Sequence, residues 1–175
     1  QVRVYTLDGN WVWNQVGAGI DGEAAVDLSG HSVSLSADGT TVAIGARNND
    51  DNGTISGHVR VYTLDGNSMW NKIGADIDGE AAIDLSGYSV SLSADGTTVA
   101  IGAIYNDGNG NASGHVRVYT LDGNSEWNQV GADIDGEAAD DRSGQSVSLS
   151  ACPLYTSDAS DQDAVGISRS CRYVS

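Results

Sequence analysis

A chain of 175 residues is long enough for one modest domain, and a hydrophobic content of 39% is typical of soluble globular material. The formal net charge of -16 at pH 7 would repel nucleic-acid phosphates, so no nucleic-acid partner is expected. No run approaches the roughly 18 to 20 apolar residues of a transmembrane helix, so membrane insertion is not expected either.

The residue types favour strands and tight turns. Gly occurs 23 times and Pro once, while Val, Ile, Thr, Tyr and Trp gather in short runs bounded by Asp-Gly and Asn-Gly pairs. The chain opens inside such a run, VRVYTL, with no initiator Met and no readable secretion signal, so we expect the natural N-terminus to lie further upstream. These features predict an all-β protein.

A tandem repeat organises the chain. The segment VRVYTLDGN begins at Val2, Val59 and Val116, which are 57 residues apart. A second segment, SVSLSADGTTVAIGA, begins at Ser32 and Ser89 with the same spacing, and its opening SVSLSA returns near the end of the repeats. Exact spacing of this kind indicates one structural unit used several times.

The best-preserved unit begins with two predicted strands. Residues 89–93 alternate apolar side chains with serines, which places Val90 and Leu92 on one face of a pleated strand. Residues 94–97 form a turn around Asp-Gly, whose glycine tolerates the positive φ that a tight hairpin needs. Residues 98–103 then read as a more buried strand, because little in TVAIGA is polar.

Two further strands complete the unit. A loop rich in Asn, Asp and Gly over residues 105–114 leads into a third strand at residues 115–121. Residues 122–124 turn the chain, and residues 126–131 form the fourth strand. Four short antiparallel strands in 57 residues are the content of a propeller blade, and a four-stranded sheet must stack on its neighbours to cover both faces.

The predicted fold is therefore a partial β-propeller built from four-stranded antiparallel blades. The expected domains are the second half of a blade (residues 1–29), two full repeats (30–86 and 87–143), and the first strand of a further repeat (144–151). An arc of this kind leaves blade faces and strand edges uncovered, so we expect marginal stability and self-association through the open edges.

Residues 87–103 (GYSVSLSADGTTVAIGA) and 106–119 (NDGNGNASGHVRVY) resemble the bacterial and algal type of the FG-GAP repeat. Units of that family run G-x-S-V, then an I/V-G-A-P-like strand, then a G-x-V-x-V-Y strand, and the resemblance extends over residues 1–151. It implies an integrin-α-like β-propeller on an extracellular or cell-surface protein that functions in adhesion. In the family, calcium loops often occupy one rim.

The resemblance fails at the family's calcium loop. The corresponding connections here, residues 37–40 and 94–97, are turns with one carboxylate each, too few for a cation that takes six to eight oxygens. Two other acidic segments space carboxylates like a calcium loop, although a solvated interblade loop is the favoured interpretation of both. These calcium candidates are Asp76, Asp78, Glu80, Asp84, Asp133, Asp135, Glu137 and Asp141. No other cofactor is expected.

Catalysis is not expected from these residues. His31 is replaced by Tyr88 and Gln145 in the other copies, while His58 and His115 recur as strand residues, so none has the placement expected of a general base. No grouping of nucleophile, base and orienting residue can be assembled. The chain is thus expected not to be an enzyme.

Tryptophan recurs at one repeat position, as Trp13, Trp70 and Trp127. Packing between blades is the favoured interpretation, because large aromatic side chains dominate such cores. A platform that binds carbohydrate is the alternative.

The repeat stops after Ala151. Residues 152–161 resemble a translated sequencing adapter, so residues 152–175 are expected to be a non-native or disordered tail, the read-through of a truncated metagenomic gene. A genuine cap closed by a disulfide between Cys152 and Cys171 is the alternative.

The sequence as a whole predicts a non-catalytic repeat scaffold for extracellular or cell-surface binding, with a protein or glycan ligand. Two alternatives stay open: a purely structural β-solenoid stalk, and a lectin-like glycan-binding module that uses the repeated tryptophans.

Overall fold

The structure, a computed structural model, describes residues 1–150 and 173–174. Residues 152–172 and 175 of the expected tail, with both cysteines of the alternative disulfide, therefore lie outside the described residues, while Tyr173–Val174 of that tail form a short strand. The strands are β1 (Val2–Leu7), β2 (Trp13–Ile20), β3 (Ser32–Leu35), β4 (Thr41–Ala46), β5 (His58–Leu64), β6 (Trp70–Lys72), β7 (Ile77–Asp78), β8 (Ser86–Leu92), β9 (Thr98–Ala103), β10 (His115–Leu121), β11 (Trp127–Gln129), β12 (Ile134–Asp135), β13 (Ser148–Leu149) and β14 (Tyr173–Val174).

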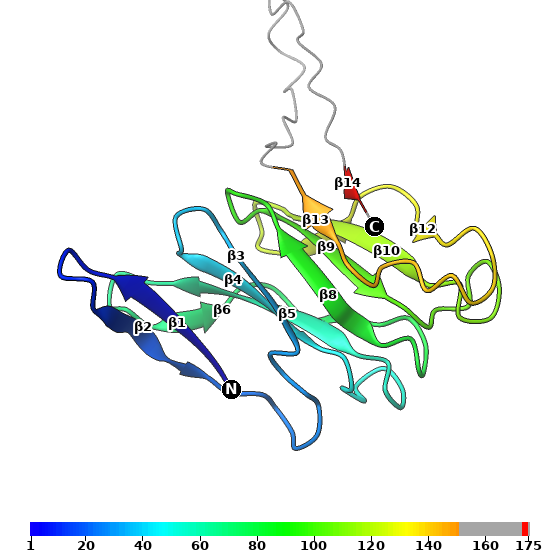
Figure 1. Cartoon of the computed structure of the whole chain (residues 1–175), viewed down its shortest axis with the longest axis horizontal. Helices are drawn as coiled ribbons and strands as arrows, with labels where there is room; N and C mark the ends of the chain where they lie inside the picture. Colours follow the sequence, from blue (N-terminus) through cyan, green and yellow to red (C-terminus); the bar gives the residue numbers. More distant parts are fainter. Residues whose placement is uncertain (151–172, 175) are drawn as a thin grey trace, which may run out of the picture.

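The chain is a partial β-propeller with a 57-residue repeat, as predicted. One complete blade has the strand order β3-β4-β5-β6 and the next has β8-β9-β10-β11, and the two lie side by side (Figure 1). The hairpin β1-β2 flanks the first blade, and β13 packs on β8 beside the second. All pairs of named strands are antiparallel. The β-solenoid alternative is wrong, because its coils would stack parallel strands.

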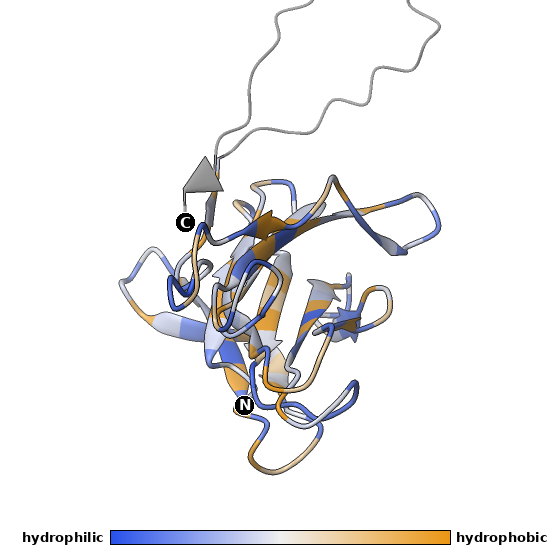
Figure 2. Cartoon of the chain, turned by 90° about the vertical axis from the view of Figure 1, so that its right-hand side faces the viewer, coloured by the Kyte–Doolittle hydropathy of each residue, from blue (hydrophilic) through white to orange (hydrophobic). Residues whose placement is uncertain are grey.

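The hydrophobic core lies between blades. Ala43 and Val61 of the first blade pack with Val90, Val99 and Ile101 of the second in one buried cluster. On the opposite face of β4, Val42 and Ile44 pack with Ile20 of β2 in a second cluster. Figure 2 shows hydrophobic segments on the inner strands. The central strands are apolar on both faces because each face meets a neighbouring sheet, which confirms the buried-strand prediction for residues 98–103.

A blade without inner strands beside it leaves apolar side chains uncovered. Leu92 on β8 is 6% exposed, because β8 packs on β3 and β4 of the preceding blade. Leu35, the same repeat position, is 44% exposed on β3, because the blade that precedes β3 consists of the hairpin β1-β2 alone in the described part of the chain. Self-association through this face stays a prediction, which sedimentation of the chain at increasing concentration would check.

The fourth strand differs from its prediction. It is split into β6 and β7 in one blade and into β11 and β12 in the next, with both parts paired to the third strand. Asp78 and Asp135 were assigned to solvated loops but lie in β7 and β12. The reason is local: Ile77 pairs with Val59 and is buried, which holds this segment on the blade edge.

The Asp-Gly turns carry their own hydrogen-bond network. At residues 36–40, the Ser36 hydroxyl donates to Asp38 Oδ1 at 2.7 Å, and the Thr40 amide and hydroxyl donate to Asp38 at 3.0 and 2.8 Å. These hydrogen bonds, chiefly that from Ser36, lower the pKa of Asp38 from 3.8 to about 2. The charged carboxylate therefore stabilises the turn.

Replacing Asp38 should make the protein less stable at neutral pH but not in strong acid. The folded pKa lies below the unfolded value of 3.8, so the stabilisation is complete above about pH 4 and is lost as the pH falls toward 2. Thermal unfolding midpoints of Asp38→Ala and the unchanged chain should differ at pH 7 and converge near pH 2. Glu126→Ala is the control for removing an exposed carboxylate. A midpoint difference that is independent of pH would contradict this role.

Candidate functional site

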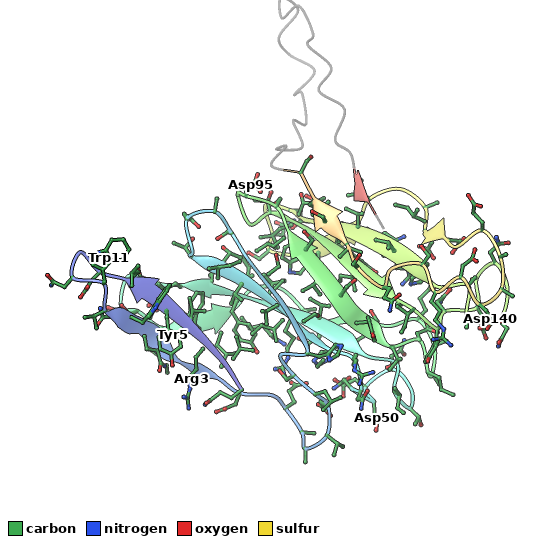
Figure 3. All side chains as sticks on the ribbon, viewed as in Figure 1. Arg3, Tyr5, Trp11, Asp50, Asp95 and Asp140 are labelled. Carbon is green, nitrogen blue, oxygen red and sulfur yellow. The ribbon has the colours of Figure 1, made fainter. Side chains whose placement is uncertain are left out.

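The two ends of the blades are built differently. Among the described residues, one end carries short turns, including those that hold Trp11 and Asp95, and the other carries longer loops, including those of Asp50 and Asp140 (Figure 3). We call the second end the long-loop rim. It comprises residues 21–31, 47–57, 79–88, 104–114 and 136–145.

Hydrogen bonds between neighbouring loops hold the long-loop rim in one conformation. The Asn52 amide donates to the Gly79 carbonyl at 2.7 Å, and the Asn109 amide donates to the Gly136 carbonyl at 2.9 Å, one repeat later. The buried Asp84 carboxylate accepts from the Asn106 side chain at 3.0 Å. The loops are thus a preformed surface, since side chains of one loop satisfy the backbone of the next.

Differences between the two complete copies concentrate on this rim. Residues 30–86 and 87–143 differ at eleven positions, and eight of the eleven lie on the long-loop rim. The rim pairs are His31/Tyr88, Arg47/Ile104, Asn48/Tyr105, Asp51/Gly108, Thr54/Asn111, Ile55/Ala112, Ile83/Asp140 and Leu85/Arg142; the other three are Met69/Glu126, Lys72/Gln129 and Ile73/Val130. The framework is therefore constant, while the surface chemistry of the rim changes from blade to blade.

One rim position combines exposure with an unfavourable backbone. Val26 and Ile83 have φ angles of 71° and 73°, a region that β-branched residues rarely adopt, and Asp140 takes the same conformation in the next copy. Val26 is 81% exposed and Ile83 is 58% exposed. The Ile83 amide donates to the Thr54 carbonyl at 2.8 Å, so the neighbouring loop holds this conformation. Apolar side chains are thus presented to solvent at a conformational cost.

Aromatic and cationic side chains meet on the same rim. The Arg47 guanidinium lies 5.6 Å from the ring centre of Tyr88, and the His31 ring lies 5.1 Å from the Tyr88 ring. Burial and, secondarily, the Arg47 charge lower the pKa of His31. In the next copy Arg142 lies 5.2 Å from the ring of Tyr105. The two interblade junctions therefore share a contact between an arginine and a tyrosine ring, but different residue positions make it in each.

The structure separates the calcium candidates into three environments. Asp84 and Asp141 accept hydrogen bonds from the amides of Ala81 and Ala138, so they close local turns. Three others join histidine-containing groups between blades: Asp76 with Glu23, Asp51 and His58, and Glu80 and Asp133 with His115. Asp78, Asp135 and Glu137 belong to neither group. Each group draws on segments of two successive repeats, which no single-loop pattern could indicate.

The histidine groups were missed by the sequence reasoning. His58 and His115 were set aside because they recur, yet the structure buries both at the start of the third strand. Burial lowers the pKa of His115, against the opposing effect of nearby carboxylates, chiefly Asp133. A signal was present: Glu23 and Glu80 precede the two histidines at a constant spacing of 35 residues.

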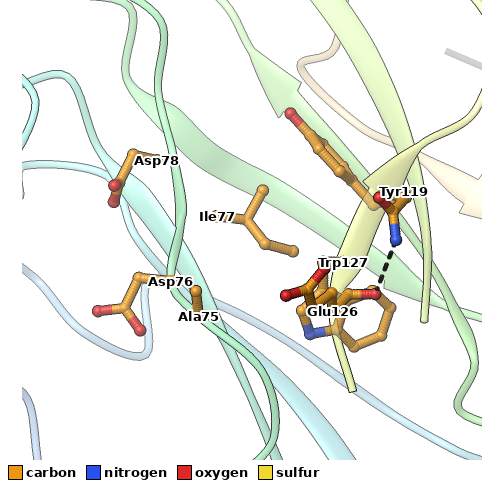
Figure 4. Close-up of a pocket in the computed structure, with 8 residues that line it drawn as sticks. Ala75, Asp76, Ile77, Asp78, Tyr119, Glu126 and Trp127 are labelled. Atoms are coloured by element: carbon orange, nitrogen blue, oxygen red, sulfur yellow. Dashed lines mark hydrogen bonds between the residues drawn. The ribbon is translucent and has the colours of Figure 1, made fainter. Parts of the chain in front are cut away.

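Two of the three recurring tryptophans, Trp70 and Trp127, pack between blades, as predicted, whereas Trp13 is 66% exposed. The Trp127 indole nitrogen donates to the Ile73 carbonyl of the preceding blade at 3.0 Å, and Trp70 donates to Val16 at the same distance. Trp127 also packs on the interblade core cluster. One edge of Trp127, together with Tyr119, Asp76 and Asp78, lines a cavity of about 340 Å³ between the blades (Figure 4).

A search for helices that could cross a bilayer found none in the part of the chain that the structure describes. A comparison with curated proteins gives no match. Among solved structures, the chain is similar to the Pseudomonas aeruginosa periplasmic gluconolactonase PpgL, with 17% identity and a TM-score of 0.47 over 85% of this chain and 39% of that one. It is also similar to Kuenenia stuttgartiensis hydrazine synthase, with 14% identity and a TM-score of 0.43 over 83% of this chain and 32% of that one. The chain thus spans well under half the length of either structure.

The repeat itself has a family match. A family model described as the FG-GAP repeat matches residues 19–62 and 72–119, more than half of the chain. The matched segments contain the G-x-S-V strands and the buried second strands of both complete blades, and most of the third strands. The chain belongs to the FG-GAP repeat family.

Proposed function

We propose that this chain is a non-catalytic binding module that uses the long-loop rim to contact a protein or glycan ligand outside the cell. The FG-GAP propeller blades supply a rigid framework, and the loops at one end supply the contact surface. Family membership supports the extracellular or cell-surface location, and the role in adhesion follows from the same resemblance.

The observation that carries the proposal is the exposed, strained position occupied by Val26 and Ile83. Folding alone does not favour a β-branched residue at positive φ, because Asn or Gly adopts that conformation at lower cost. Burial does not compensate, since both side chains are largely exposed. Conformational cost without a packing benefit is typical of residues kept for contact with a partner.

The variation among copies supports the same conclusion. The equivalent position is Asp140 in the third copy, and the aromatic residues at the junctions change as well. A surface with one backbone and different side chains in each blade can provide several distinct contacts to one large ligand. A purely architectural array would have no reason to concentrate its differences at one end.

The double variant Val26→Asn/Ile83→Asn tests the proposal. We expect unchanged or higher stability, by up to about 1 kcal/mol for each relieved residue, because Asn tolerates positive φ. We also expect at least a tenfold loss of binding to whichever ligand the unchanged chain selects from a panel of extracellular proteins and an array of glycans. Thermal unfolding and equilibrium binding provide the two measurements.

Met69→Asn is the matched control, because Met69 is an exposed apolar residue at the short-turn end of the first blade. It should leave ligand binding unchanged. Loss of stability in the double variant would mean that Val26 and Ile83 serve folding, and unchanged binding would exclude them as contact residues.

A lectin-like function is the second candidate, and the cavity beside Trp127 is the observation that favours it. Tyr119 and Trp127 supply aromatic surface, and Asp76 and Asp78 supply acceptors for sugar hydroxyl groups. The glycan array separates the two candidates: a glycan that still binds the Asn double variant but not Trp127→Phe would identify the cavity as the site.

A further inference from the structure

We propose that the interblade group Glu23, Asp51, His58 and Asp76 binds a divalent transition-metal ion, of which Zn²⁺ is the representative. This group, the four-donor site, offers one imidazole nitrogen and three carboxylate oxygens, all within 4.8 Å of one another. Atoms bound to one ion at about 2.0–2.2 Å lie at most about 4.4 Å apart, so a small contraction would complete the coordination.

His58 supplies the evidence that something is bound there. Its side chain is 1% exposed, and its Nδ1 atom has no hydrogen-bond partner among the residues that the structure describes. The nearest carboxylate oxygen, Asp51 Oδ2, lies 3.6 Å from Nδ1, too far for a hydrogen bond and suitable for two ligands of one ion. A buried polar atom without a partner is costly, and a metal ion between Nδ1 and the carboxylates would remove that cost.

The same arrangement occurs one repeat later. His115 is 3% exposed, and its Nδ1 also lacks a hydrogen-bond partner in the described part of the chain. This atom lies 3.9 Å from Glu80 Oε2 and 3.7 Å from Asp133 Oδ2. We call this group the three-donor site, because Gly108 stands where the first copy has Asp51. Two independent junctions thus leave the same imidazole nitrogen facing carboxylates.

The charges around His58 leave room for a divalent ion. Four carboxylates surround it, those of Glu23, Asp51, Asp76 and Asp78, and the two neighbouring cations are Arg60 and Lys72. Arg60 Nη1 lies 3.2 Å from Glu23 Oε1, and Lys72 Nζ lies 2.5 Å from Asp76 Oδ1, so each cation engages one oxygen of its partner. Four negative and two positive groups leave an excess of two negative charges.

The three-donor site is more fully occupied by protein groups. Arg117 contacts both carboxylates of the site, those of Glu80 and Asp133. The Gln129 side chain donates to Asp133 Oδ1 at 2.6 Å, and the Asn106 side chain donates to Glu80 Oε2 at 3.4 Å. Fewer free donors predict weaker binding than at the four-donor site. The imidazole ligand favours Zn²⁺ and its neighbours in the first transition row over Ca²⁺ or Mg²⁺, which take oxygen ligands.

Zn²⁺ titration of the full chain tests the proposal. The parent protein carries Cys152→Ser and Cys171→Ser to remove thiol ligands, is freed of metal with a chelator, and is titrated by calorimetry in excess Mg²⁺. We expect the four-donor site to bind Zn²⁺ at least tenfold more tightly than the three-donor site. His58→Gln should weaken the tighter site at least tenfold, and Zn²⁺ should shift the His58 ring signals in the NMR spectrum of the parent.

Two reciprocal variants keep the test independent of the buried histidine. Asp51→Gly should reduce the four-donor site to the affinity of the three-donor site, and Gly108→Asp should raise the three-donor site about tenfold. In the second copy Gly108 lies next to Asp135. The equivalent residues of the first copy are Asp51 and Asp78, so the first copy already holds the pair of carboxylates that Gly108→Asp would create. Asp38→Ala, which removes a carboxylate at the short-turn end, should leave the affinity of both sites for Zn²⁺ unchanged. Zn²⁺ binding that is equal in the parent, His58→Gln and both reciprocal variants would overturn the proposal.

Discussion

Leu92→Ala is expected to lower the free energy of unfolding by about 2–4 kcal/mol, while Leu35→Ala, at the same repeat position, should lower it by less than about 1 kcal/mol. Leu92 is buried in the cluster between the two blades, and Leu35 is largely exposed. The side chains are identical and their strands are equivalent, so the difference measures blade stacking itself. Urea unfolding of both variants provides the comparison.

The same pair also tests self-association. If the open face of β3 mediates contact between chains, Leu35→Ala should weaken the association measured by sedimentation. Leu92 lies on β8, so Leu92→Ala removes no side chain from that face. Equal losses of stability in the two variants would contradict the assignment of the core to the junction between blades. A monomeric unchanged chain at all concentrations would contradict the expected self-association.

Gly102→Ala should be strongly damaging, with a loss of about 3 kcal/mol or more in the free energy of unfolding. A Cβ atom at Gly102 would overlap the carbonyl oxygen of Gly144, far inside van der Waals contact, and would crowd the Ser89 hydroxyl. That hydroxyl donates to the same Gly144 carbonyl at 2.7 Å. The methyl group would therefore push the next repeat segment away from the blade and break this hydrogen bond.

Gly123→Ala is the matched control for Gly102→Ala. A Cβ atom at Gly123 meets nothing within 4 Å, so its effect on stability should stay within about 0.5 kcal/mol. Thermal unfolding of both variants at one pH is sufficient. If the two variants unfold at the same temperature, the close approach of Gly144 is not important for the fold.

The Gly102 contact also explains why the family's two motifs recur together. Gly144 of one G-x-S-V segment contributes the carbonyl oxygen, and Ser89 of the preceding copy's G-x-S-V segment contributes the hydroxyl. Gly102 of the I-G-A strand leaves the space for both. The first junction repeats the arrangement: Ser32 Oγ donates to the Gly87 carbonyl at 2.7 Å beside Gly45. In the sequence these glycine and serine positions are three separate repeated features, and the packing shows that they meet at one contact between successive copies.

Local patterns were sufficient to predict most strands. The second and third strands, residues 98–103 and 115–121, have the predicted bounds, because each has a strong run of β-forming residues between clear turn signals. The short pairings at Ile77–Asp78 and Ile134–Asp135 were missed. Two residues provide too little pattern, and only the register with the third strand makes them part of the sheet.

The candidate site was less accessible from sequence. The eight calcium candidates were chosen by spacing within one loop, but three of them join histidine groups drawn from two successive repeats. His58 is separated from Glu23 by 35 residues and from Asp76 by 18, and nothing local indicates that the three converge. The calcium assignment stays a prediction, and the single-loop arrangement on which it rests is replaced by interblade groups.

The sequence by itself determined the period, the strand types, the turns and the need for stacking, because each depends on interactions between residues close in the chain or on the repeat of an apolar pattern. Only the tertiary structure decided which face of each blade meets which neighbour, which loops share a rim, and which buried imidazole faces which carboxylates. Those features depend on contacts between residues tens of positions apart, whose geometry is set by how one blade is rotated against the next.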